Sequence, residues 1–153
     1  MEAMIGYCGY NCHQCAARSD DAAVRQQLVD GWRRIFGHQQ YTAENVRCDG
    51  CRSEGRLADQ QCRARPCAIE RSVASCALCD EFVCDQVRHL LASREGLLIC
   101  CRPRTGPVTR EEYALCMQQF ESMPNLVRLL AESGKIGPWA LQRPEAGLGE
   151  GDG

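Results

Sequence analysis

Ten cysteines in the first part of the chain stand at spacings by which proteins hold metal ions. They are Cys8, Cys12, Cys15, Cys48, Cys51, Cys62, Cys67, Cys76, Cys79 and Cys84. Three pairs are separated by only two residues, and such a gap lets a tight turn aim both thiolates at one ion. Zinc binds four ligands in a tetrahedron at about 2.3 Å from each sulfur, and two such turns supply them. The pattern therefore predicts cysteine-bound zinc.

The number of ions follows from the number of ligands. Two sites of four cysteines use eight of the ten, so we expect about two zinc ions per chain. Three separate sites would need twelve ligands and would have to recruit others. The candidates are His13, His89, Cys100 and Cys101. Cysteine triplets at the two ends of the run each lack a fourth ligand, so we expect at least one site to join distant segments.

We expect bound metal to hold the cysteine-rich stretch together, because that stretch is poor in apolar residues. Residues 38–81 contain few large aliphatic side chains, so burial alone will not fold them. The N-terminus has no basic start followed by an apolar run, and no stretch approaches the roughly 18 apolar residues of a membrane span. We therefore expect a cytoplasmic protein without a membrane segment, in a compartment where disulfides do not persist. Thirteen cysteines, an odd number, also fit disulfide pairing badly.

Hydrophobic periodicity predicts a helix over residues 19–37, capped by Ser19 or Asp20 and ended by Gly37. A second helix is expected over 81–95, capped by Asp80, with Cys84 in its first turn and Gly96 after its end. A short helical turn is expected after Pro66. The apolar run 97–101 reads as buried, either as a strand or as a continuation of the second helix.

The C-terminal part reads as helical. Thr109 and Glu112 form a capping box, and the helix that follows places Cys116 on its apolar face, where we expect a core residue and not a ligand. Another helix begins near Pro124 and ends before Gly134. No stretch shows the alternation of a strand. The predicted fold is mainly α with irregular zinc-knuckle loops. A cysteine-rich metal-binding domain (1–96) packs on a helical region (97–143), followed by a disordered tail (144–153).

The cysteine pattern resembles a known family, and the resemblance covers about residues 5–92. It is carried by Cys8-Gly-Tyr-Asn-Cys12-His-Gln-Cys15, Cys48-Asp-Gly-Cys51-Arg-Ser-Glu-Gly-Arg, Cys62-Arg-Ala-Arg-Pro-Cys67-Ala-Ile-Glu and Cys76-Ala-Leu-Cys79-Asp-Glu-Phe-Val-Cys84. These stretches are similar to the cysteine-rich domain of unknown function 3795, a bacterial and archaeal family thought to bind zinc. The resemblance implies that the ten cysteines include the family's ligands, and it implies no catalytic activity. Asp59 and Gln60 stand where family members often carry a further cysteine.

We expect a structural zinc protein that serves as an interaction or regulatory module with a protein partner. No His-Glu-x-x-His, P-loop or Gly-x-Ser-x-Gly motif is present, so we do not expect an enzyme. An iron–sulfur redox protein is the alternative, because thiolates also bind iron and Cys8-x3-Cys12-x2-Cys15 has a cluster spacing. Nucleic-acid binding is a second alternative, since residues 47–71 carry six arginines, but a net charge of -2 does not favour it.

Overall fold

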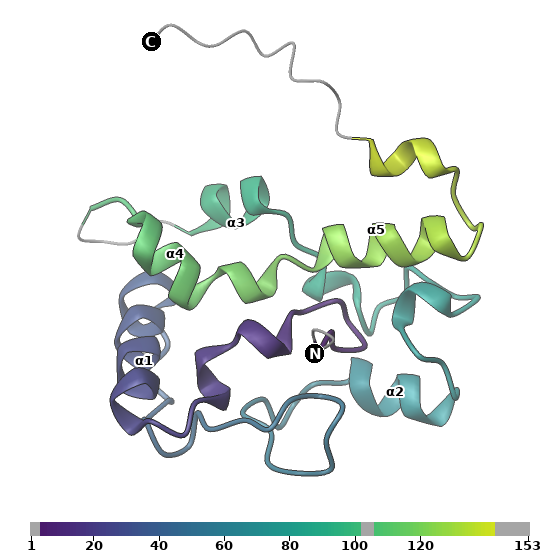
Figure 1. Cartoon of the computed structure of the whole chain (residues 1–153). Coiled ribbons are helices and arrows are strands. Elements are labelled where there is room, and N and C mark those ends of the chain that lie inside the picture. The colour runs from purple at the N-terminus through teal and green to yellow at the C-terminus, as the bar shows by residue number, and fades with distance from the viewer. Residues whose placement is uncertain (1–3, 102–105, 143–153) are drawn as a thin grey trace, which may run out of the picture.

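Short helices joined by irregular loops make up the protein. The computed structural model describes residues 4–101 and 106–142, and within them there is no strand beyond an isolated bridge between Ile5 and Asn11. The α-helices are α1 (Ala22–Phe36), α2 (Ala64–Glu70), α3 (Arg94–Cys100), α4 (Arg110–Cys116) and α5 (Ser122–Glu132) (Figure 1). The 3-10 helices are η1 (Cys12–Gln14), η2 (Ala16–Arg18), η3 (Cys76–Leu78), η4 (Arg88–Leu90), η5 (Gln118–Phe120) and η6 (Pro138–Leu141). The prediction of a mainly helical, cysteine-rich fold is confirmed.

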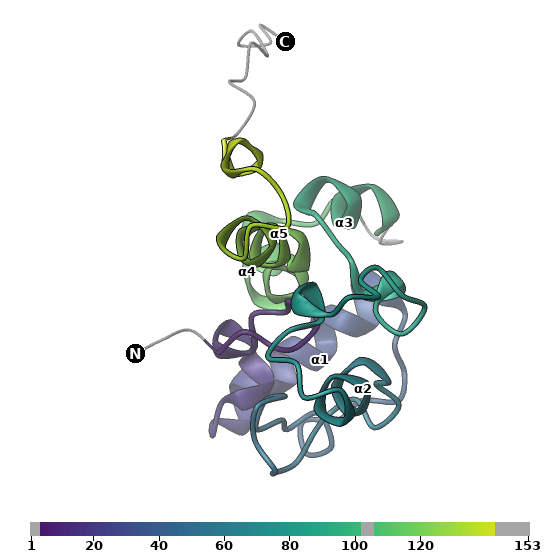
Figure 2. The same cartoon turned by 90° about the vertical axis from the view of Figure 1, so that its right-hand side faces the viewer.

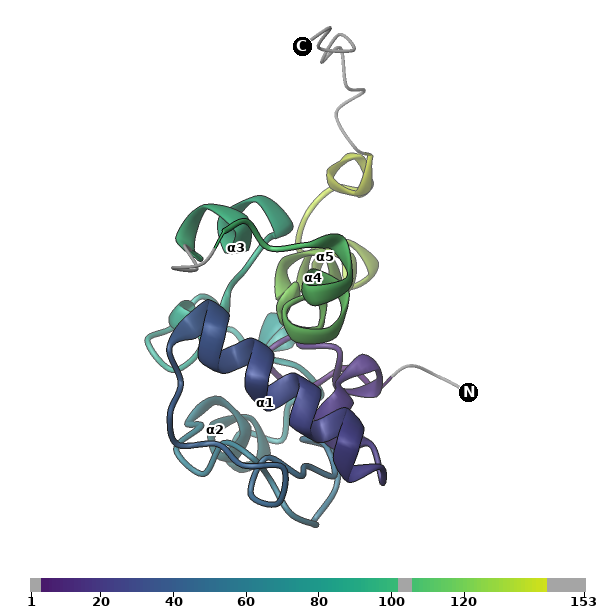
Figure 3. The same ribbon diagram turned by 90° about the vertical axis from the view of Figure 1, so that its left-hand side faces the viewer.

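The N-terminal segment lies in the middle of the molecule. Helices α4 and α5 pass over one side of it, and α1 and α2 lie on the other side (Figures 2 and 3). A hydrogen bond of 2.9 Å from the backbone N of Asn11 to the carbonyl oxygen of Gln119 joins this segment to η5. The first cysteines of the chain are therefore held between its two halves.

Helix α1 forms where the apolar stripe predicts it. Asp21, and not Ser19 or Asp20, is the cap, and its carboxylate accepts from the backbone N of Ala23 at 2.8 Å. Gly37 ends the helix in the left-handed conformation, with φ of 73°. One face of α1 is buried against α4. Both helices contribute to a core that includes Leu28, Trp32, Tyr113 and Met117, which we call the first core cluster and which draws on both halves of the chain.

Trp32 and Cys116 connect these two helices. The indole Nε1 of Trp32 donates to the carbonyl oxygen of Cys116 at 2.9 Å, in a buried position. The side chain of Cys116 is 1% exposed and belongs to the same core cluster. Its prediction as a core residue is confirmed.

The capping box of α4 is also confirmed. The hydroxyl of Thr109 accepts from the backbone N of Glu112 at 3.1 Å, and the Glu112 carboxylate accepts from the backbone N of Thr109 at 3.2 Å. The same carboxylate pairs with Arg34 of α1 at 2.5 Å. The Arg34 guanidinium holds the pKa of Glu112 below its usual range.

The helix expected over residues 81–95 is wrong. Residues 81–87 form turns, η4 follows, and α3 begins only after Ser93, whose hydroxyl accepts from the backbone N of Gly96 at 3.1 Å. The supposed stripe does not share one face, because Val87 is fully buried whereas Val83 is 41% exposed. Cys84 therefore lies in a turn and not at a helix N-terminus, and Gly96 lies inside α3.

The apolar run 97–101 is helical but is not buried as a whole. Leu97 packs against the first core cluster, whereas Leu98 is 47% and Ile99 68% exposed. The short α3 turns only one side toward the core. The predicted tail at 144–153 lies outside the described residues. None of the helices in the described stretches has the length and apolar character that crossing a bilayer requires.

Close packing between α1 and α4 gives a stability test. A Cβ added at Gly31 would overlap the sulfur of Cys116. We expect Gly31→Ala to destabilise the protein by roughly 1–3 kcal/mol, the usual cost of overpacking. In a Cys116→Ala background the same change should stabilise by up to about 1 kcal/mol, because Ala favours helices more than Gly does. Urea unfolding of the parent protein, the two single variants and the double variant measures this double-mutant cycle. Equal effects of Gly31→Ala in both backgrounds would contradict the packing.

Candidate metal centres

The ten cysteines of the spacing pattern line two neighbouring cavities. The larger has a volume of about 130 Å³, and we call it the six-cysteine cavity. Its cysteines are Cys8, Cys12, Cys15, Cys48, Cys51 and Cys62. The smaller has a volume of about 20 Å³, and we call it the four-cysteine cavity. Its cysteines are Cys67, Cys76, Cys79 and Cys84. All thirteen cysteines of the chain lie in described stretches and are free thiols.

Three consecutive segments build the four-cysteine cavity. Cys67 comes from α2, Cys76 begins η3, Cys79 follows the end of η3, and Cys84 comes from the loop beyond it. The hydroxyl of Ser75 caps η3 by accepting from the backbone N of Ala77 at 3.2 Å. The short elements thus bring one sulfur from α2 and three from the following loop to one place.

The four sulfurs of this cavity interact. Burial, followed by the nearby Cys84, Cys67, Cys79 and Cys62 sulfurs, raises the pKa of Cys76 to about 11. Arg71 of α2 reaches the sulfur of Cys79 at 4.0 Å and pairs with Glu81 at 2.5 Å. Four thiolates gathered in one small space repel one another unless a cation lies between them.

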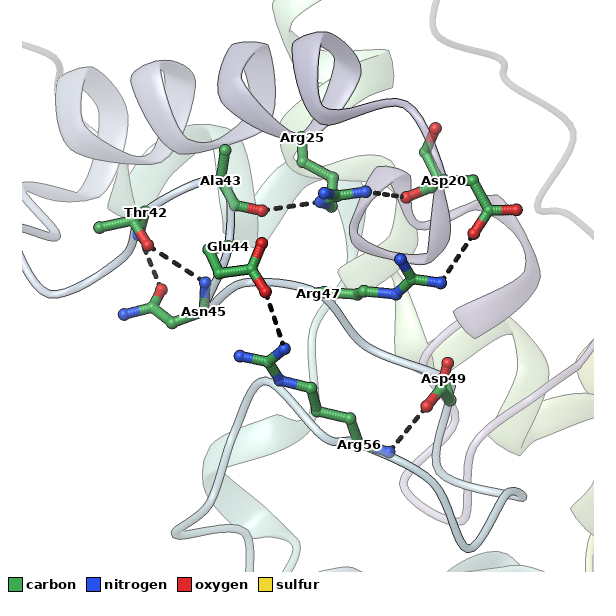
Figure 4. Close-up of polar contacts among 10 residues, drawn as sticks. Asp20, Arg25, Thr42, Ala43, Glu44, Asn45, Arg47, Asp49 and Arg56 are labelled. Atoms are coloured by element: carbon green, nitrogen blue, oxygen red, sulfur yellow. Dashed lines mark hydrogen bonds and ion pairs between the residues drawn. The ribbon is translucent and has the colours of Figure 1, made fainter.

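A network of polar contacts positions the turn at Cys48–Cys51 (Figure 4). The backbone N of Cys48 donates to the carbonyl oxygen of Ala17 at 2.9 Å. Arg47 pairs with Asp20 at 2.8 Å, and the Asp49 carboxylate accepts from the backbone N of Arg56 at 2.7 Å. The turn is therefore fixed against η2 on one side and closed by its own loop on the other.

The N-terminal loop supplies three more sulfurs to the six-cysteine cavity. Gly9 has φ of 95°, and a Cβ there would overlap Leu126 and the backbone of Ser122 on α5. Only glycine allows this loop to approach α5 so closely. The side-chain oxygen of Asn11 then caps η1 by accepting from the backbone N of Gln14 at 3.3 Å. The close approach and the cap place Cys8, Cys12 and Cys15 around the cavity.

Cys12 and Cys51 are paired within the cavity. Their side chains are hydrogen-bonded, which lowers the pKa of Cys12 to about 6 and raises that of Cys51. Burial raises the pKa of Cys8 to about 12 and that of Cys15 to about 11. With these raised pKa values, Cys8, Cys15 and Cys51 hold their protons near neutral pH.

Gln119 lines the six-cysteine cavity from η5 and was not predicted from the sequence. Its side chain is 2% exposed, and neither its Nε2 nor its Oε1 has a hydrogen-bond partner among the described residues. A buried amide without partners is costly, so such a group calls for an explanation. No motif identifies it, because it is distant in sequence from every cysteine that it faces.

Arg65 was also missed as a positioning residue. From α2 its guanidinium donates to the carbonyl oxygens of Cys51 and Ser53, each at 2.8 Å. Arg52 donates to the carbonyl oxygens of Ile5 and Ala74, and thereby joins the loop to the N-terminal segment. Arg52 and Arg65 thus fix the backbone next to the cavity cysteines through hydrogen bonds to carbonyl oxygens.

The remaining ligand candidates lie outside both cavities. His13, His89 and Cys100 are exposed, and Cys101 packs against the first core cluster. Across the described ranges, no group of three or more His, Cys, Asp or Glu side chains is already arranged as a metal-binding cluster. Ligation would require the sulfurs to move closer together than they stand.

Differences in thiol exposure give a chemical test. Cys100 is exposed, whereas Cys116 is 1% exposed and burial raises its pKa to about 12. Because the thiolate is the nucleophile, iodoacetamide at pH 8 should label Cys100 at least about a hundredfold faster. Peptide mass spectrometry measures both rates, and unfolding in urea should make them similar. Comparable rates in the native protein would contradict the placement of Cys116 in the core.

Comparison with known proteins bears on the segment that holds these cavities. Residues 4–89 match the model of a family described as a protein of unknown function, DUF3795, and all ten cavity cysteines lie in that range. Searches of curated proteins and of solved structures each found no match. The match covers more than half of the chain, and the protein is therefore a member of the DUF3795 family.

Proposed function

We propose that the protein binds zinc through its cavity cysteines, and that this zinc holds the family region in shape for an interaction or regulatory role. One observation carries the proposal. Ten of thirteen cysteines, drawn from segments up to 76 residues apart, gather at two cavities, whereas Cys100, Cys101 and Cys116 lie elsewhere. A set of core cysteines placed only for packing would not separate in this way.

The four-cysteine cavity offers the ligands for one zinc ion. Four cysteines, bound as thiolates, are the ligand set of closed structural zinc sites. A volume of about 20 Å³ is of the size that accommodates one small ion or water and little more. The guanidinium of Arg71 lies beside Cys79, where it would offset the negative charge of a four-thiolate site.

All-thiolate ligation favours a structural role over catalysis. Catalytic zinc usually keeps an open coordination position and mixes histidine or carboxylate ligands with water. His13 and His89 are exposed and line neither cavity. Exposed apolar side chains do occur on α3 and η6, where Ile99 is 68% and Trp139 71% exposed, and they suit contact with another protein.

The arginine-rich stretch does not favour nucleic-acid binding. Arg47 and Arg56 pair with Asp20 and Glu44, and Arg71 pairs with Glu81. The guanidinium groups of Arg52 and Arg65 donate to backbone carbonyls. Five of the six arginines thus contact groups of the same chain, which leaves less positive charge for phosphates.

Metal analysis of protein purified without added metal tests the proposal. We expect at least two zinc ions per chain, one of them from the four-cysteine cavity, and a colourless solution. Cys84→Ser should remove about one zinc, whereas the matched control Cys100→Ser should remove none. A brown, iron-containing protein would favour the iron–sulfur alternative, and a metal-free folded protein would exclude both.

Zinc removal should destabilise the cysteine loops first. The free energy of binding a structural zinc, roughly 10–16 kcal/mol, contributes directly to folding of the segment that holds it. After addition of a strong chelator with reductant, we expect hydrogen exchange to accelerate over residues 48–90. Helices α1 and α4 should keep their protection longer, because they share the core around Trp32. Mass spectrometry resolves these segments. Unchanged exchange in the loops after complete metal removal would contradict the role of zinc.

A further inference from the structure

The six-cysteine cavity has more sulfurs and more room than one zinc ion needs. Its volume of about 130 Å³ compares with about 20 Å³ for the four-cysteine cavity. A single tetrahedral zinc would leave two of the six sulfurs unused. We propose that this cavity holds a binuclear zinc centre, with Cys12 and Cys51 bridging two ions. This inference rests on the zinc binding proposed above.

Cys12 and Cys51 are the central pair of the six. Both sulfurs lie against Gly6, where an added Cβ would be 3.4 Å from the sulfur of Cys12 and 3.6 Å from the sulfur of Cys51. Two sulfurs beside the same glycine, between the other four cysteines, are in the place that bridging ligands require.

The other four cysteines divide between the two ends of this pair. Cys15 and Cys48 both pack against the first core cluster. At the other end, Cys8 and Cys62 both belong to a second core cluster, which they share with Cys76 and Cys84 of the four-cysteine cavity. The arrangement therefore assigns Cys15 and Cys48 to one ion and Cys8 and Cys62 to the other.

This assignment satisfies every ligand requirement without spare sulfurs. Two tetrahedral ions need eight bonds, and four terminal thiolates plus two bridging thiolates supply eight. Binuclear zinc held by six cysteines is an established type of protein site. With one ion in the four-cysteine cavity, the chain would bind three zinc ions through ten cysteines. Bridging thus allows a third ion without recruiting His13, His89, Cys100 or Cys101, which line neither cavity.

The cavity lining suits the charge of such a centre. Two Zn²⁺ ions and six thiolates carry a net charge of -2, and Arg18 and Arg65 line the cavity. Gln119 supplies an independent observation, because its buried amide lines the same cavity without a hydrogen-bond partner among the described residues. Metal-bound thiolate sulfur accepts hydrogen bonds from N–H groups, and such outer contacts orient ligands and tune the metal. The Nε2 of Gln119 would donate to a sulfur of the centre.

Cadmium substitution tests the bridge directly in the full chain. The protein is reconstituted with ¹¹³Cd²⁺, and metal content and ¹¹³Cd NMR spectra are recorded. We expect three cadmium ions per chain and three signals in the range of all-thiolate ligation. Two signals should show scalar coupling to each other through the bridging sulfurs, and the third should be uncoupled.

Variants assign the signals. Cys84→Ser should remove only the uncoupled signal, Cys12→Ser should change the coupling because Cys51 is then the one remaining sulfur bridge, and Cys100→Ser should change nothing. Gln119→Leu should shift the coupled pair and leave the third signal in place. If the cysteine variants do not fold, the wild-type spectrum and stoichiometry decide alone.

Two failures are distinguishable. Two ions per chain with no coupling, in protein that also holds about two zinc as purified, would overturn the binuclear centre and leave the proposed zinc binding intact. Absence of bound metal from folded protein would overturn both. Iron with acid-labile sulfide in the protein as purified would also overturn the binuclear centre, because an iron–sulfur cluster would then occupy the cavity.

Discussion

The gathering of ten cysteine sulfurs at two cavities is the feature on which the rest of this structure depends. Ten sulfurs stand where a domain of this size ordinarily buries leucine and isoleucine, and the loops that carry them have few other apolar contacts. As neutral thiols they give only the modest packing of small apolar groups. As thiolates they need a cation. We propose that zinc is that cation, so that metal binding and folding of the loops are one process.

The two halves of the chain meet at the six-cysteine cavity. Trp32 from α1, Leu90 from η4 and Gln119 from η5 all line it, although they are far apart in sequence. The indole N–H of Trp32 also donates a hydrogen bond to the carbonyl oxygen of Cys116, in the core shared by α1 and α4. The cavity therefore borders the core against which α3 packs through Leu97, and α3 carries exposed apolar side chains on its other side. This connection suits a protein whose metal-bound shape presents a contact surface.

Local signals predicted much of the fold, and contacts distant in sequence account for the errors. The stripe of α1 and the capping box at Thr109 are local patterns, and both elements formed as expected. The stretch after Asp80 has a similar apolar period, but it does not form a continuous helix. Instead, Cys84 and Val87 line the four-cysteine cavity. Spacing identified the ten cysteines that line the cavities, yet their division into six and four depends on how the loops cross. Gln119 could not be found, because only the tertiary fold brings it to the sulfurs.

Zinc K-edge X-ray absorption of the protein, purified without added metal, tests the central claim most directly. It reports which atoms surround the ion in the folded molecule. The account predicts a first shell of four sulfur atoms at about 2.3 Å and no nitrogen or oxygen neighbour. Absence of a zinc edge from folded protein, or a shell of nitrogen and oxygen atoms at about 2.0 Å, would contradict it.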